Sequence, residues 1–114
     1  MINPSLAPDQ SSKEVNVIER FQRLAAEWRE RSIYLSNTAQ MAMLEPYQRI
    51  IGMGPVVVPL ILEELRREPD HWFWALESIT DQNPVTAEAA GNVRLMADLW
   101  IQWGLRQGII GHDR

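Results

Sequence analysis

The sequence predicts an all-α fold, a single compact domain of four to five helices with a helical hairpin in its second half. Three observations predict this fold class. Apolar residues recur at three- and four-residue spacing along most of the chain, which is the period of an amphipathic helix. The length of 114 residues is enough for one hydrophobic core. The β-branched run at residues 56–58 is flanked by prolines, and its spacing favours a helix over a strand.

The first helix is expected over residues 13–31, after a flexible N-terminal arm of residues 1–12 that contains two prolines and three serines. Ser11 and Glu14 have the spacing of a capping box, in which the two side chains close the first turn of a helix. The helix is amphipathic, with charged residues on the face opposite its apolar stripe. That stripe consists of Val17, Ile18, Phe21, Leu24, Ala25 and Trp28.

Two short helices are expected next. The first runs from about Asn37 to Met43, with Ser36 as its N-cap. The second covers residues 47–51, with Pro46 in its first turn, where proline is well tolerated. Gly52 is expected to end this helix in the left-handed conformation.

The clearest helix is expected from Pro55 to about Arg67, with Pro69 ending it. Its glutamates and arginines, including Glu64, are expected to face water. The following helix is expected from His71 to Thr80, with Asp70 as its N-cap. The buried stripe of the first of these two helices is expected to consist of Val56, Leu60, Ile61 and Leu65.

A turn at residues 81–84 precedes the last helix. Asn92 is expected to cap that helix, and Gly108 is expected to close it. The helical domain then covers residues 13–110, and residues 111–114 form a short tail. The residues expected to be largely buried are Leu60, Leu65, Leu76, Ile79, Leu99 and Trp103.

Composition excludes several kinds of site. The chain has no cysteine, which excludes disulfides, thiolate zinc sites, iron–sulfur clusters and cysteine nucleophiles. His71 and His112 are its two histidines, so a metal site with several histidine ligands is excluded too. The longest apolar run is interrupted by Pro59 and is shorter than the roughly 18 residues of a membrane-spanning helix. We therefore expect no metal, no cofactor and no membrane partner. The N-terminus lacks the regions of a signal peptide, so we expect a cytoplasmic location.

Three local patterns that suggest catalysis or ligand binding have simpler structural explanations. Asp70 beside His71 resembles a carboxylate with a general base, but Asp70 is explained as a helix cap. The glutamates near Arg66 and Arg67 are explained as an ion-paired surface. The glycines of residues 52–54 lack the preceding strand, the third glycine and the lysine of a phosphate-binding loop. We therefore expect no catalytic residues and a protein that is not an enzyme.

The most unusual local composition is the aromatic run at residues 71–74. Successive helix residues are about 100° apart, so Trp72 and Trp74 cannot share one buried stripe. Either the last helix, with its own two tryptophans, covers Trp74, or an aromatic patch is exposed to a partner, since tryptophan is enriched in binding hot spots. In the second case we expect Trp74, or else His71 with Trp72, to be partly exposed. The candidate partner-binding residues are Trp74, Trp72, His71, Tyr47 and Arg49.

Residues 47–83 resemble one HEAT-type helical repeat. The residues that carry the resemblance are Gly54-Pro55 before the first helix, Pro59-Leu60-Ile61 and Glu64-Leu65 within it, and Asp70, Trp74-Ala75-Leu76 and Ile79 for the second. The resemblance covers about a third of the chain and one unit only. Trp72 and Trp74 are also larger than the residues expected in a stackable helix, so the resemblance implies a HEAT-like hairpin rather than a solenoid.

The string YQRIIGMG…PLILEEL…PDHWFWAL…IT…NPV…GN…W…WG, over most of residues 41–108, is similar to a group of short, uncharacterised bacterial proteins. This resemblance implies a bacterial cytoplasmic origin and no catalytic activity.

Two functional hypotheses follow. The first is a protein-interaction module, an accessory or regulatory subunit that binds another protein, with an antitoxin-like role as one form of it. The alternative is a DNA-binding transcriptional regulator, which requires a basic patch that the net charge of −4 masks. That charge disfavours a general affinity for nucleic acid. The partner is either another protein or a second copy of the chain in a homodimer, and the sequence leaves both open.

Overall fold

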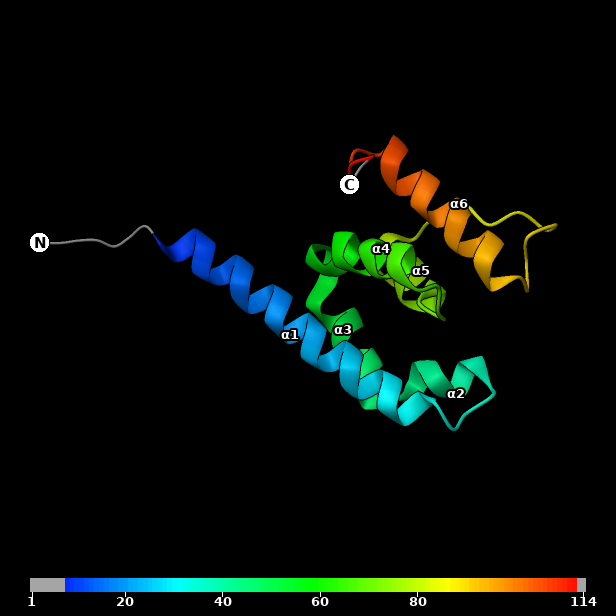
Figure 1. Cartoon of the computed structure of the whole chain (residues 1–114), viewed down its shortest axis with the longest axis horizontal. Helices are drawn as coiled ribbons and strands as arrows, with labels where there is room; N and C mark the ends of the chain where they lie inside the picture. Colours follow the sequence, from blue (N-terminus) through cyan, green and yellow to red (C-terminus); the bar gives the residue numbers. More distant parts are fainter. Residues whose placement is uncertain (1–7, 113–114) are drawn as a thin grey trace, which may run out of the picture.

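The structure, a computed structural model, describes the backbone of residues 8–112 and the side chains of residues 13–112. Over this range the chain is all-α and contains no strand, which confirms the predicted fold class. Residues 1–7 of the expected arm and residues 113–114 of the expected tail lie outside it. The helices are α1 (Pro8–Ser32), α2 (Thr38–Met43), α3 (Glu45–Met53), the 3₁₀ helix η1 (Gly54–Val57), α4 (Val58–Arg67), α5 (Phe73–Thr80) and α6 (Val93–Arg106) (Figure 1).

The longest helix, α1, packs against α3 and η1. It begins at Pro8, so the expected start at residue 13, with Ser11 in the cap, is wrong. Proline suits the first turn of a helix because the N–H it lacks has no helical partner there. Figure 1 shows the N-terminal part of α1 extending past the other helices. The predicted apolar stripe is accordingly buried from Phe21 onward, whereas Ile18 is exposed.

The caps of the next two helices differ from the prediction by one and two residues. Asn37, not Ser36, caps α2, and its Oδ1 accepts a hydrogen bond from a backbone N–H three residues later at 2.9 Å. α3 continues through Gly52 and ends at Met53, with Gly54 as its C-cap at a φ of +83°. Pro55 explains this later end, because proline disfavours the α conformation of the residue before it.

The helix expected from Pro55 is divided into η1 and α4. A 3₁₀ helix has about three residues per turn, which shifts the phase of the apolar residues that follow. Val56 is therefore exposed and Leu60 half-buried, although both were expected in the core. The buried apolar residues of this segment are Val57, Val58, Ile61, Leu62 and Leu65.

α5 begins at Phe73, two residues later than predicted. Asp70 organises the turn before it rather than capping it. The Asp70 carboxylate accepts a hydrogen bond from His71 N at 2.8 Å, and its carbonyl accepts one from Trp72 N at 2.9 Å. This turn directs Trp72 into the core at the point where α5 starts.

The last helix, α6, packs on α4. Asn92 caps it as predicted, with its Oδ1 accepting a hydrogen bond from Leu95 N at 3.0 Å. Gly108 closes it as predicted, with a φ of +73°. Ile109 N then donates to Gly104 O at 2.9 Å, which is the bond expected after a left-handed glycine cap.

The prediction of the core is correct for Leu65 and Leu76, which are buried. It is only partly correct for the others, because they lie at the margin of the core. The half-buried residues are Leu60, Ile79, Leu99 and Trp103. Glu64, which was expected to face water, is 7% exposed and accepts a hydrogen bond from Arg29 on α1.

Candidate functional site

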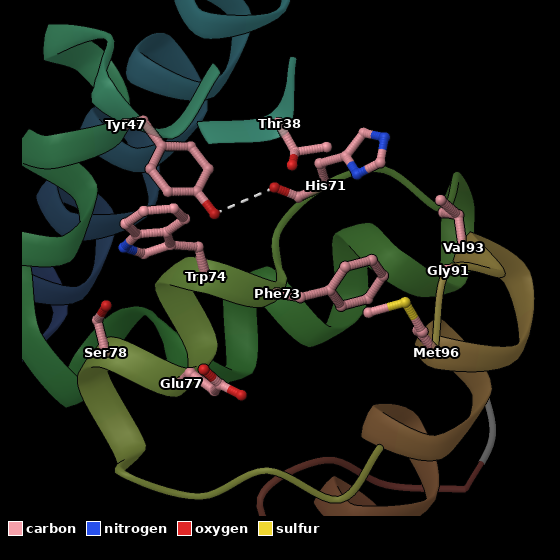
Figure 2. A pocket seen from close by; sticks show the side chains of 10 residues that line it. All are labelled: Thr38, Tyr47, His71, Phe73, Trp74, Glu77, Ser78, Gly91, Val93 and Met96. Atoms are coloured by element: carbon pink, nitrogen blue, oxygen red, sulfur yellow. Dashed lines mark hydrogen bonds between the residues drawn. The ribbon is translucent and has the colours of Figure 1, made fainter. Parts of the chain in front are cut away.

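A cleft of about 640 Å³ lies between α5 and the start of α6, and Thr38 at the start of α2 also lines it. Figure 2 shows the side chains that line it, with Phe73 pointing toward Met96 on α6. The lining thus combines aromatic and thioether surfaces with a few polar groups, as small-ligand and peptide sites commonly do.

The floor of the cleft is fixed by the phenol of Tyr47, which is fully buried. Its oxygen accepts a hydrogen bond from Ala75 N at 2.9 Å and donates one to His71 O at 3.1 Å. Burial raises the pKa of the Tyr47 phenol above its ordinary value; the hydrogen bond from Ala75 lowers the pKa and nearby Asp70 raises it. Through these two bonds α3 positions the beginning of α5, and with it the side chains on the cleft wall.

The ring of Tyr47 packs in a cluster of buried aromatic side chains. The rings of Tyr47 and Trp72 are nearly parallel with centroids 5.8 Å apart, and the ring of Trp28 on α1 lies 4.5 Å from Trp72. Phe21 completes the cluster at 5.8 Å from Trp72. Such pairs add to the burial of the rings, so the start of α5 is held by packing as well as by hydrogen bonds.

One wall of the cleft is the exposed face of α5. Trp74 keeps 44% of its surface exposed. Glu77 and Ser78 follow three and four residues later, the spacing at which helical side chains are neighbours, and both are exposed. The same face therefore presents an indole ring, a carboxylate and a hydroxyl to the cleft (Figure 2).

The structure separates the residues predicted to bind a partner into three groups. Trp74 is exposed and His71 is half-buried, and both line the cleft. Trp72 is fully buried and does not line the cleft, so the structure contradicts its predicted place on a partner surface; Tyr47 is fully buried too, but it lines the floor of the cleft. The reason is that the turn before α5 directs Trp72 toward α1 and α3, where it stacks on Tyr47.

Arg49 was predicted to lie near the same surface, and this prediction is also wrong. It pairs with Glu45 one turn earlier on α3, and it lines a separate hollow between α1 and α3. Two helix residues at spacing two are about 200° apart, so Arg49 points away from the side of α3 that carries Tyr47.

The alternative in which the last helix covers Trp74 is wrong as well. Trp100 is fully buried, and Trp103 packs against it edge to face with ring centroids 5.2 Å apart. Both tryptophans thus belong to the contact of α6 with the rest of the core. Trp74 is left on the cleft wall.

Several residues that line the cleft were not among those predicted from the sequence. Glu77 and Ser78 could have been found, because their spacing from Trp74 places them on its face of the helix. Thr38 and Met96 could not, since they enter the cleft from helices far apart in the chain and their positions depend on packing.

The charge of the cleft is negative. Among the lining residues that the structure describes, Glu77 carries a formal negative charge and none is a lysine or an arginine. Among the side chains of residues 13–112, no group of three or more histidine, aspartate or glutamate residues is placed to hold a metal ion. None of the described helices is long and apolar enough to cross a membrane.

Comparisons with family models, with curated proteins and with solved structures find no match to this chain.

Proposed function

We propose that this chain is a non-enzymatic protein-interaction module, an accessory or regulatory subunit that docks a partner protein in the cleft between α5 and α6. The observation that carries the proposal is the exposure of Trp74. Three other tryptophans, Trp28, Trp72 and Trp100, are fully buried, whereas Trp74 keeps 44% of its surface exposed on the wall of a cleft. Large rings in such concave positions are the common anchors of protein interfaces.

The rigidity of the site supports the proposal. Trp74 lies one residue before Ala75, whose N–H is held by the Tyr47 phenol at 2.9 Å. A side chain on a helix held in this way loses little conformational freedom when a partner binds, so more of its contact energy contributes to affinity.

The alternative of DNA binding has less support. Five arginines of α1, α3 and α4 form ion pairs with glutamates and are less available to phosphates. These arginines are Arg29, Arg31, Arg49, Arg66 and Arg67.

We also propose that the protein acts in a bacterial cytoplasm and that α4 and α5 form a HEAT-like hairpin. The absence of cysteine supports the cytoplasm, because small secreted domains often depend on disulfides. The order of α4, the turn at Asp70 and α5 is that of a helical hairpin.

The test compares two exposed aromatic residues. Partner proteins are captured from the source cell with the tagged wild-type chain, with Trp74→Ala and with Tyr34→Ala, and any protein lost only with Trp74→Ala is purified. Tyr34 is the matched control, because it is 89% exposed and does not line the cleft. Truncation of a hot-spot tryptophan reduces affinity by about 2 kcal/mol or more, which is roughly a 30-fold rise in Kd.

Calorimetric titration of the purified partner decides the outcome. The proposal expects the rise in Kd for Trp74→Ala and an unchanged Kd for Tyr34→Ala. A partner that binds Trp74→Ala as tightly as the wild type would show that the cleft is not the docking site.

A further inference from the structure

We propose that the cleft recognises an arginine side chain of the partner, whose guanidinium group lies on the indole of Trp74 and pairs with the carboxylate of Glu77. The inference rests on the proposed function, because it names the chemistry of the segment that docks in the same cleft.

Three side chains of α5 face the cleft together. Trp74, Glu77 and Ser78 occupy positions i, i+3 and i+4 of a regular helix, so their side chains project from one face. All three line the cleft and all three are exposed (Figure 2). An aromatic face, an anion and a hydroxyl acceptor are thus presented together to any occupant.

The charge of the cleft is complementary to that of an arginine side chain. Four other glutamates, on α1, α3 and α4, are paired with arginines of the chain. For Glu77, no arginine, lysine or histidine among the described residues lies within ion-pair distance. The described lining contains no lysine or arginine that would repel a cation, and the chain as a whole has a net charge of −4. The cleft is therefore matched to a positively charged group.

The combination of an indole ring with a carboxylate favours arginine over lysine. The guanidinium group is planar, so it can lie flat on an indole while its edge donates hydrogen bonds to a carboxylate and a hydroxyl. Bidentate bonds of this kind to a carboxylate are stronger than bonds between neutral groups. A lysine ammonium is a compact, strongly hydrated point charge and matches only the carboxylate.

The apolar part of the cleft matches the aliphatic stem of the partner's arginine side chain. Phe73 and Met96 lie next to the α5 face, and Figure 2 shows them facing each other. The three-carbon stem of an arginine packs well on such surfaces while its head group stays at the polar edge. A neighbouring apolar residue of the partner segment can fill the rest of this cleft of about 640 Å³.

The experiment does not require the sequence of the partner segment to be known. A phage-displayed library of random linear peptides is selected on the wild-type chain and depleted on Trp74→Ala. The enriched peptides are synthesised with arginine, with citrulline, which is its neutral isostere, and with lysine. Each is titrated calorimetrically against the wild type, Glu77→Gln and Glu19→Gln. Glu19 is the matched control, because it is exposed on α1 and does not line the cleft.

The proposal expects enriched peptides that contain arginine. Replacement by citrulline is expected to raise Kd about tenfold or more, because a charged hydrogen-bonded pair is lost. Glu77→Gln is expected to have a similar effect, replacement by lysine a smaller one, and Glu19→Gln none. Circular dichroism confirms that each variant is folded.

Two results would overturn the inference in distinguishable ways. Peptides that need Trp74 but bind equally well with citrulline would refute arginine recognition and leave the docking cleft standing. A library that yields no Trp74-dependent peptide would refute both proposals. If light scattering shows a dimer that Trp74→Ala dissociates, the occupant is a second copy of the chain and the inference is likewise refuted.

Discussion

Arg29 on α1 donates a hydrogen bond to the carboxylate of Glu64 on α4, so two residues that are 35 positions apart in the sequence join these helices. The Glu64 side chain is 9% exposed, and Arg67 also lies 3.4 Å from its second oxygen. A carboxylate with so little access to water depends on these partners, because a buried charge without them is strongly unfavourable.

Arg29→Ala is therefore expected to lower the free energy of unfolding by about 1–3 kcal/mol, less than for a fully buried pair because Arg29 is partly exposed. The matched control is Arg31→Ala, which removes an exposed pair with Glu27 on the same helix. That change is expected to cost about 0.5 kcal/mol or less. Urea denaturation measures both values, and equal effects of the two variants would contradict the structural role of Arg29.

Two glycines with opposite surroundings provide a second prediction. A Cβ on Gly104 of α6 would lie 2.6 Å from Leu62 Cδ1 and 3.3 Å from Ile110, and both neighbours are buried. Gly104→Ala is expected to destabilise the fold by about 1–3 kcal/mol through overpacking of α6 on α4. Gly52 lies within α3, and a Cβ there would meet nothing within 4 Å.

Gly52→Ala is accordingly expected to stabilise the protein by about 0.5–1 kcal/mol, because alanine loses less backbone entropy in a helix than glycine. Thermal denaturation of both variants checks the pair. A rise in Tm for Gly104→Ala would show that α6 lies further from α4 than the structure has it.

The hydroxyl of Tyr47 provides a third prediction. Tyr47→Phe removes the acceptor of Ala75 N and the donor to His71 O while leaving the aromatic ring in place. An unsatisfied buried N–H costs about 1–3 kcal/mol, so a loss of stability in this range is expected. Tyr34→Phe, at an exposed position, is the control and is expected to change nothing measurable. Chemical denaturation distinguishes the two, and an equal stability of both variants would refute the role of this hydroxyl.

The same phenol predicts an alkaline limit to stability. Burial raises the folded-state pKa of Tyr47 above the ordinary value of 10.0. Below pH 10 the Tyr47 phenol is protonated in both the folded and the unfolded chain, and its full contribution to stability is present. Above pH 10 the phenol of the unfolded chain ionises first, so the free energy of unfolding falls as the pH rises. In Tyr34→Phe, which keeps only this phenol, tyrosinate absorbance is expected to appear together with unfolding. Tyrosinate forming near pH 10 in a chain that stays folded would show that the Tyr47 phenol is accessible.

The sequence predicts those features of the structure that depend on residues close together in the chain, and it does not predict those that depend on contacts between distant helices. The caps at Asn92 and Gly108 were predicted correctly because cap chemistry depends on a few neighbouring residues. Val56 was placed in the core wrongly, because a single 3₁₀ turn shifts the helical phase. Burial of Glu64 could not be predicted, since its partner lies on another helix.

The candidate site also has a part that could be predicted from the sequence and a part that could not. The angle between helix positions predicted that Trp72 and Trp74 could not share one buried stripe, but the sequence left open which of them is exposed. The structure buries Trp72 and leaves Trp74 exposed. The cleft beside it requires α2 and α6 to approach α5, and nothing in the local sequence of Thr38 or Met96 indicates this.

Trp72 and Trp74 provide the last prediction, because they lie two residues apart at the start of α5 and have opposite environments. Trp72 is fully buried within 6 Å of three aromatic rings, and Trp74 is 44% exposed. Trp72→Ala is expected to destabilise the fold by about 3–5 kcal/mol, the usual range for a large aromatic residue removed from a core. Trp74→Ala is expected to cost about 1 kcal/mol or less, since nearly half of its surface is already in contact with water. Thermal and urea denaturation of the two variants measure the difference. If Trp74→Ala unfolds the chain as readily as Trp72→Ala, then Trp74 belongs to the core, and the cleft assigned to a partner does not exist in solution.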